Sequence, residues 1–119
     1  MEHLGQFSIS TSSLSGSVFG QRLQADGIKA IVRLSGRFEF SAHREFRETI
    51  DTALQNKAIE EVVIDLRDVD YVDSSALGML LMLREKANGA KKKIALANPR
   101  GVVKQALDIA HFEKIFSII

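Results

Sequence analysis

The sequence predicts an α/β domain in which a mixed sheet of four to five strands carries helices packed on it. Short β-branched segments alternate with segments whose apolar residues recur every three or four positions, which is typical of alternating strands and helices. The chain has 119 residues, enough for one compact domain. We therefore expect a Ser-rich arm at residues 1–17 and one folded domain at residues 18–119.

The N-terminal segment allows two interpretations. Serine and threonine crowd the stretch between Gly5 and Gly20. Such a stretch buries little apolar surface and gains little from ordering, so a flexible arm is the preferred interpretation. Phe7 and Ile9 support the alternative, a first strand at residues 7–10.

The first regular elements are predicted after Val18. Residues 18–24 and 28–34 flank the dipeptide Asp26-Gly27, which is typical of a β-hairpin turn. Gly36 is expected to end the second strand, and Ser41 to cap an amphipathic helix. The apolar residues of that helix are Ala42, Phe46, Ile50, Ala53 and Leu54.

The middle of the chain predicts a central strand and a buried helix. Residues 62–66 form a nearly continuous apolar run, which suits a strand covered on both faces. Asp73, Ser74 and Ser75 offer N-cap groups for an apolar helix that stops at Asn88-Gly89.

The last third of the chain predicts a strand, a helix and a closing segment. The strand spans residues 94–97, and Asn98 and Pro99 supply an N-cap and a first helical position. One face of the helix is apolar, and residues 112–119 are expected to form a short helix or an edge strand. The residues of that face are Val102, Val103, Ala106, Leu107 and Ala110.

Composition argues against several functional classes. Sixteen basic and fifteen acidic residues leave a formal net charge of +1, so nucleic acid is not the expected partner. The sequence has no cysteine and therefore no thiolate nucleophile or Cys-ligated metal. Its apolar runs are too short for membrane insertion, and its first residues are neither basic nor apolar, so a cytoplasmic location is expected.

A series of aspartates precedes the buried helix but lacks the features of a metal site. No glycine and bidentate glutamate follow at calcium-loop spacing, so we expect no metal and no cofactor. One of these carboxylates, Asp65, is expected to satisfy a neighbouring backbone group. The series comprises Asp65, Asp68, Asp70 and Asp73.

The serine pair is the most informative local feature. Ser75 is expected in the turn between strand and helix, where backbone N–H groups and the helix dipole favour negative charge. Phosphorylation would add a charge of about −1.5 to −2 there. On local chemistry alone, simple helix capping is the preferred role of the pair.

The wider segment resembles the STAS family, typified by bacterial anti-sigma factor antagonists. The similarity lies in Val63-Ile64-Asp65-Leu66, Val69 and the string Val72-Asp73-Ser74-Ser75-Ala76-Leu77-Gly78. It extends upstream through Leu34-Ser35-Gly36 and Phe38-Glu39, and downstream through residues 102–108 and 112–116. The resemblance implies a single STAS-like domain.

That resemblance implies a binding switch and no enzymatic activity. Antagonists of this type bind a GHKL-fold anti-sigma factor that is also a serine kinase. The kinase phosphorylates the second serine of the pair, here Ser75, which releases the partner, and a PP2C-type phosphatase restores binding. Asp73, Ser74 and Ala76 are the neighbours of this phosphoacceptor. The implied partner-binding residues are Gly36, Phe38, Glu39, Phe40, Ser74, Ser75, Leu77 and Gly78.

Two positions depart from the family pattern. Ala76 stands where glycine is commonest, which is a mild change because a helix accepts alanine better than glycine. The second departure is Glu39 between Phe38 and Phe40, because the family more often has Asp followed by polar residues there. Each of these two phenylalanines is expected to belong either to the core or to an interface.

An alternative function is a STAS subunit of a membrane transport complex, resembling the small cytoplasmic partner of a lipid-transporting ABC system. The intact Asp73-Ser74-Ser75 favours the switch, because a transport subunit needs no phosphoacceptor. A homodimer through the edge strands near Val18 and the C-terminus is left open.

Overall fold

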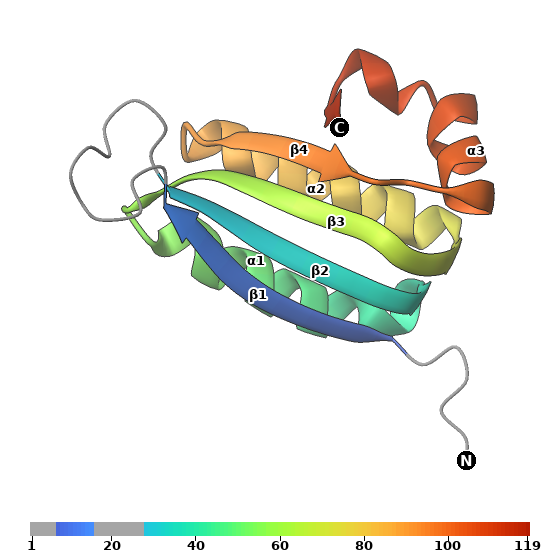
Figure 1. Cartoon of the computed structure of the whole chain (residues 1–119), viewed down its shortest axis with the longest axis horizontal. Helices are drawn as coiled ribbons and strands as arrows, with labels where there is room; N and C mark the ends of the chain where they lie inside the picture. The colour runs from blue at the N-terminus through green and yellow to red at the C-terminus, as the bar shows by residue number, and fades with distance from the viewer. Residues whose placement is uncertain (1–6, 16–27) are drawn as a thin grey trace.

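The five strands form one mixed sheet whose order follows the chain, as Figure 1 shows. This computed structural model describes residues 7–15 and 28–119. β1 is antiparallel to β2, and the other neighbouring strands are parallel, which confirms the predicted mixed sheet. The strands are β1 (Ser8–Ser15), β2 (Ile28–Phe38), β3 (Ile59–Val72), β4 (Lys93–Ala97) and β5 (Ser117–Ile118).

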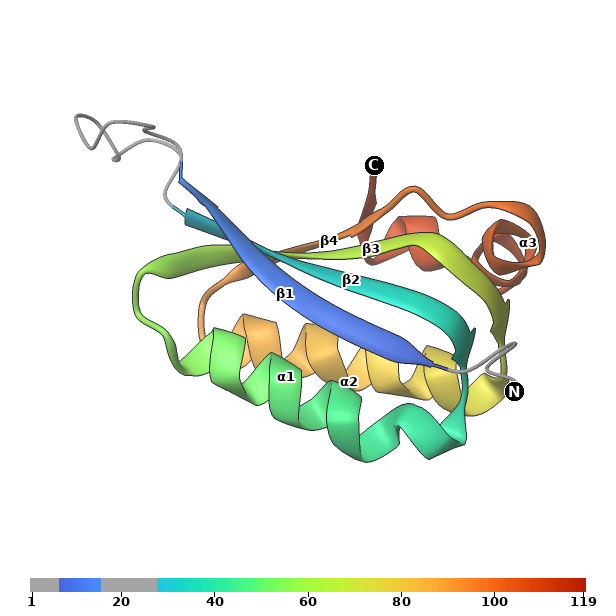
Figure 2. The same ribbon diagram turned by 60° about the horizontal axis from the view of Figure 1, so that its bottom comes forward.

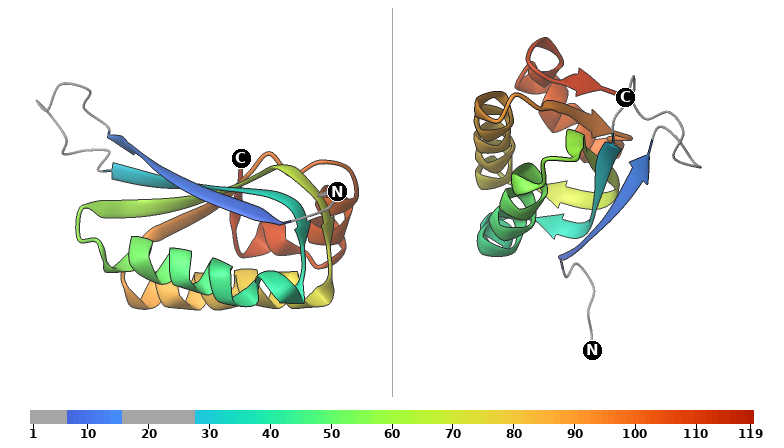
Figure 3. Two further views of the ribbon diagram at one scale, coloured as in Figure 1. Left: turned by 90° about the horizontal axis from the view of Figure 1, so that it is seen from below. Right: turned by 90° about the vertical axis from the view of Figure 1, so that its left-hand side faces the viewer.

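Helices cover one face of this sheet and one of its ends. α1 and α2 lie side by side beneath the sheet (Figure 2), and α3 lies at the end where β3 terminates (Figure 3). One apolar core joins the helices to the sheet. The helical elements are η1 (Phe40–Ala42), α1 (His43–Gln55), α2 (Ser74–Gly89), α3 (Gly101–Ile109) and η2 (Phe112–Lys114).

The prediction of a flexible arm is wrong for Ser8–Ser15, which form β1. Pairing with β2 satisfies the backbone groups on one side of this edge strand, and its polar side chains Ser8, Ser10 and Ser12 are exposed. Phe7 and Ile9 anchor it by packing on the core. The rest of the arm, the strand expected at residues 18–24 and the turn at residues 26–27 lie outside the described residues.

β3 is the central strand, as predicted, but it extends beyond residues 62–66 in both directions. Val62 and Ile64 belong to the core beneath the helices, while Val63 belongs to a second cluster with Ala95 and Ala97. All three β3 residues are buried, and Val63 packs against residues of the neighbouring strands rather than against a helix.

Two predicted helix caps and one strand end are wrong. Ser41 lies inside η1, and the N-cap of α1 is Ala42, whose side chain makes no capping bond. The predicted cap Asn98 does not cap α3, whose N-cap is Arg100. Asn98 instead has a φ of 58°, and its side-chain amide donates to Asp65 at 3.1 Å. β2 runs past Gly36, which takes a φ of 84° where the register with β3 shifts.

The closing segment contains both of the elements considered for it. Residues 112–114 form the 3-10 turn η2, and β5 then adds to the sheet beside β4. The Phe112 and Phe116 rings pack in a tilted arrangement with centroids 5.2 Å apart, and both are buried in the core. This aromatic pair holds the C-terminal segment against the domain.

Candidate functional site

The site is built around the Asp73 carboxylate, which joins two elements distant in sequence. As the N-cap of α2, Asp73 accepts a hydrogen bond from the Ala76 N–H at 2.8 Å through Oδ1. Its Oδ2 accepts from the Phe40 N–H at 3.2 Å. The carboxylate therefore begins α2 and also holds the turn that precedes α1.

The two serines after Asp73 have different surroundings. Ser74 is exposed, whereas Ser75 is half-buried and lines a groove of about 250 Å³ between the start of α1 and the exposed side of α2. The described residues that line this groove are Phe40, His43, Ser75, Gly78, Met79 and Met82. Hereafter we call it the Ser75 groove.

The structure assigns different roles to the two phenylalanines around Glu39. Phe38 is fully buried and packs against Phe7 and Phe46, with ring centroids 5.7 and 5.1 Å away. The expectation that Phe38 contacts a partner is therefore wrong, because its side chain belongs to the core. Phe40, two residues later, is 67% exposed at the rim of the Ser75 groove.

The other residues implied by the resemblance lie in several environments. Glu39 pairs with Arg37 at 3.5 Å, and the Arg37 guanidinium lies 3.9 Å above the centre of the Tyr71 ring. Leu77 is half-buried against the core. A Cβ added to Gly78 would meet no atom within 4 Å, so its backbone forms an open part of the groove wall.

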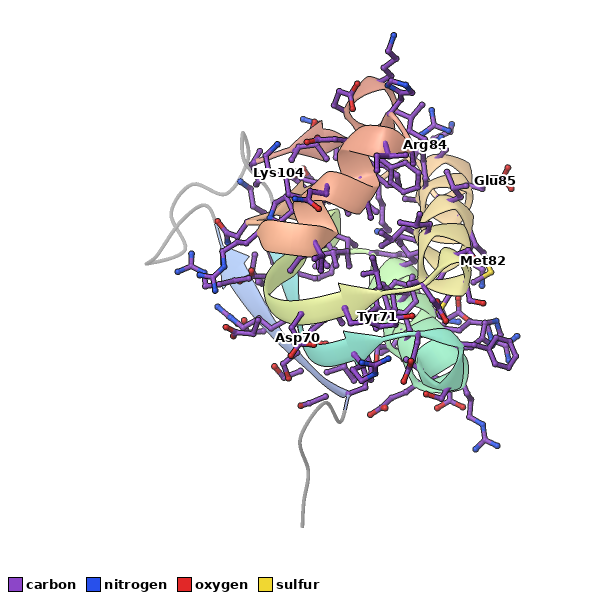
Figure 4. The ribbon with its side chains drawn as sticks, turned by 90° about the vertical axis from the view of Figure 1, so that its right-hand side faces the viewer. Asp70, Tyr71, Met82, Arg84, Glu85 and Lys104 are labelled. Atoms are coloured by element: carbon purple, nitrogen blue, oxygen red, sulfur yellow. The ribbon has the colours of Figure 1, made fainter. Side chains whose placement is uncertain are left out.

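His43, Met79 and Met82 line the groove and were not singled out from the sequence. The two methionines follow Ser75 by four and seven residues, a spacing that places them on its helical face. Figure 4 shows Met82 on α2 and Tyr71 at the end of β3, viewed from the side of the molecule where β3 ends. His43 gave no comparable signal, because it approaches Ser75 only through tertiary structure.

Two of the four aspartates in the series before α2, Asp65 and Asp73, have partners in the structure, and Asp68 and Asp70 are exposed. Asp65 Oδ1 accepts from the Arg67 N–H at 3.0 Å and from the Asn98 amide, which confirms that Asp65 satisfies a neighbouring backbone group. Among the described residues, no group of three or more acidic or histidine side chains is placed to hold a metal ion. Within that same part of the chain, no helix is long and apolar enough to cross a membrane.

The Asp73 carboxylate is engaged by two backbone donors rather than by the Ser75 hydroxyl. A serine nucleophile requires a base within hydrogen-bonding reach of its hydroxyl. Ser75 instead presents a half-buried hydroxyl on the first turn of a helix, beside an apolar groove.

Comparison with known proteins gives matches over most of the chain. The family model described as "Mlab, STAS domain" matches residues 21–118. A STAS-domain containing protein of Pseudomonas aeruginosa (strain UCBPP-PA14) is 45% identical over 96 residues, which are 79% of this chain and 91% of that protein. An anti-sigma F factor antagonist of Paenibacillus polymyxa is 31% identical over 88 residues, 74% of this chain and 75% of the relative.

Solved structures show the same fold. The crystal structure of an anti-sigma factor antagonist from Mycobacterium paratuberculosis superposes with a TM-score of 0.69. The match has 20% identity and covers 93% of this chain and 85% of that one. At this identity the likeness concerns the arrangement of strands and helices.

Proposed function

Because the chain belongs to the STAS-domain family and is homologous to an anti-sigma factor antagonist, we propose that it is a phosphorylation-controlled binding switch. With a free Ser75 hydroxyl it binds a GHKL-fold anti-sigma factor that is also a serine kinase. Phosphorylation of Ser75 releases this partner, and a PP2C-type phosphatase restores binding. The observation that carries the proposal is the position of Ser75 in an apolar groove beside the exposed Phe40.

Exposed aromatic side chains lie on the surface near Ser75. Phe40 is 67% exposed at the rim of the groove, and Tyr71, at the end of β3 and two residues before Asp73, is 36% exposed. Exposed aromatic and aliphatic side chains beside a groove are common anchors of protein interfaces. We therefore propose partner contact for the exposed or half-buried residues of the implied set, which are Gly36, Glu39, Phe40, Ser74, Ser75, Leu77 and Gly78.

Phosphorylation would change this surface through charge. A phosphoryl group adds about −1.5 to −2 units beside the Asp73 carboxylate, and a partner that covers the groove would have to desolvate that charge. Coupling free energies of about 1–3 kcal/mol are common for such switches and change affinity about 5- to 150-fold. This effect is large enough to move the partner from bound to free.

The transport-complex alternative is not favoured. A subunit that acts only by docking needs no hydroxyl in the position of Ser75, whereas the switch depends on one. The named function of the Paenibacillus polymyxa relative also supports the switch.

The proposal is tested by comparing variants at Ser75. In pull-downs from native cells, Ser75→Ala is expected to retain the kinase partner, and Ser75→Asp to lose at least about five-fold of it. Ser10→Ala and Ser10→Asp are the matched controls, because Ser10 is exposed on β1 and does not line the groove. Equal retention by the two Ser75 variants would refute the switch.

A direct measurement of modification complements the pull-down. After incubation of the protein with cell extract and ATP, mass spectrometry of the segment from Asp73 to Leu83 is expected to show phosphate on Ser75. Phosphate on Ser74 alone, or no phosphate together with co-purification of an ABC ATPase, would contradict the proposal.

A further inference from the structure

His43 is the one ionisable side chain among the described residues that line the Ser75 groove, and Ser75 supplies the one hydroxyl. The remaining lining residues are Phe40, Gly78, Met79 and Met82. A dianion placed on Ser75 would thus share a largely apolar groove with a single imidazole. Charges interact more strongly in such surroundings than in bulk water.

The position of His43 follows from the local backbone. η1 is a 3-10 turn, in which side chains three residues apart are eclipsed, and the His43 N–H donates to the Phe40 carbonyl. The His43 ring accordingly stacks on the Phe40 ring, with centroids 6.1 Å apart and an interplanar angle of 21°.

This stacked pair is tied to the helix that carries Ser75. The Phe40 N–H donates to the Asp73 carboxylate, which also caps the first turn of α2. The bond from the Phe40 N–H to Asp73 therefore holds the backbone just before His43 beside the first turn of α2. His43 does not depend on a flexible loop for its place in the groove.

Other charged groups near His43 already have partners or face solvent. Across the groove, the Asp73 carboxylate accepts from two backbone N–H groups. Four residues before His43, Glu39 pairs with Arg37, and four residues after it, Arg47 is exposed. Among the described residues that line the groove, His43 is thus the one whose side chain can donate an N–H to a phosphate on Ser75.

We propose that His43 binds the phosphoryl group of phosphorylated Ser75 across the groove. The inference rests on the proposed modification of Ser75 and specifies how the modified state is held. The phosphoryl oxygens accept from an imidazole N–H of His43, and this contact occupies the space that is open when Ser75 is unmodified. The phosphorylated protein then blocks its own groove, so charge and occupancy both oppose partner binding.

The test uses the full chain with phosphoserine incorporated during synthesis at position 75, so it does not require the natural kinase. Phosphorus NMR across pH 5–9 gives the second pKa of the phosphoryl group, near 6 in the absence of a partner group. A neighbouring cation stabilises the dianion, so this pKa is expected to be lower with His43 than in His43→Gln, by about half a unit or more.

Two further variants separate charge from structure. His43→Lys restores a cation and is expected to restore the lowered pKa of the phosphoryl group. His111→Gln is the matched control, because His111 is exposed after α3 and does not line the groove. Circular dichroism of the unphosphorylated variants checks that each one folds.

The same phosphoryl pKa in the wild-type protein, His43→Gln and His43→Lys would overturn the inference. Kinase-partner binding by the phosphoserine protein is measured separately. Loss of binding with no shift of the pKa would leave the switch standing and refute the role of His43. A shift without loss of binding would support the His43 contact and refute the switch.

Discussion

At the scale of single residues, Asp73 contributes most to the geometry of the site. One of its carboxylate oxygens begins α2 and the other holds the turn before α1, so a short-range capping motif also makes a long-range contact. The sequence predicted that Asp73 or its neighbours cap the helix. It did not predict the bond to Phe40, because that bond depends on how two parallel strands end side by side.

Replacement of Asp73 should lower the free energy of unfolding through the loss of both hydrogen bonds. Asp73→Ala is expected to lower the free energy of unfolding by about 1–2 kcal/mol, since it removes a helix cap and leaves the Phe40 N–H without this acceptor. Asp73→Asn keeps an oxygen for capping and should lose less. Urea denaturation measures both, and equal stability of Asp73→Ala and the wild type would contradict the assignment.

The phenylalanines on either side of Glu39 provide a second residue-scale prediction. Phe38→Ala is expected to lower the free energy of unfolding by about 3–5 kcal/mol, because it opens a cavity between two other aromatic rings. Phe40→Ala should change stability by less than about 0.5 kcal/mol, since this ring is exposed.

The same two variants are then compared in binding. Phe40→Ala is expected to weaken capture of the kinase partner by the unphosphorylated protein at a temperature where both proteins are folded. Full binding by Phe40→Ala would remove Phe40 from the docking surface.

At the scale of elements, β1 is a segment whose composition predicts flexibility but which tertiary structure orders as a strand. Its serines and threonine predicted a flexible arm, yet the edge of β2 supplies a backbone partner for each residue from Ser8 to Ser15. Phe7 and Ile9 were the two local indications of order, and they are the side chains that pack on the core. Weak intrinsic propensity is overridden here by pairing and by a few apolar contacts.

Substitutions on opposite faces of β1 test this register. Ile9→Asp is expected to lower the free energy of unfolding by about 2 kcal/mol, because it places a charge against the core. Ser10→Asp is the matched control on the exposed face and should cost less than about 0.5 kcal/mol. Equal effects in chemical denaturation would mean that β1 does not bury alternate side chains.

At the scale of the whole molecule, the sequence predicted the layers better than the contacts between them. The α/β class, the central β3 and the apolar helix after Asp73 followed from periodicity, which is set by neighbours along the chain. The position of Asn98 and the approach of His43 to Ser75 depend on tertiary packing, for which periodicity carries no signal. The separate roles of Phe38 and Phe40 also required the structure.

A single core predicts a single unfolding transition. The main cluster includes residues from all three helices and from β2, β3 and β4, and Phe7 and Ile9 pack against it from the β1 side. Far-ultraviolet circular dichroism and the fluorescence of Tyr71, the single tyrosine in a chain without tryptophan, are therefore expected to give coincident denaturation curves. Separated midpoints would show that part of the domain unfolds independently.

The order of the sheet also bears on how the chain folds. Within residues 7–15 and 28–119, each strand lies beside the strand that follows it in the sequence, so no pairing among them has to wait for a later strand to insert between two earlier ones. β2 and β3 share the longest parallel register, and α1 lies in the connection between them. We expect this βαβ unit to form the nucleus, with β1 joining at one edge and β4 and then β5 at the other, so that the C-terminal segment docks last.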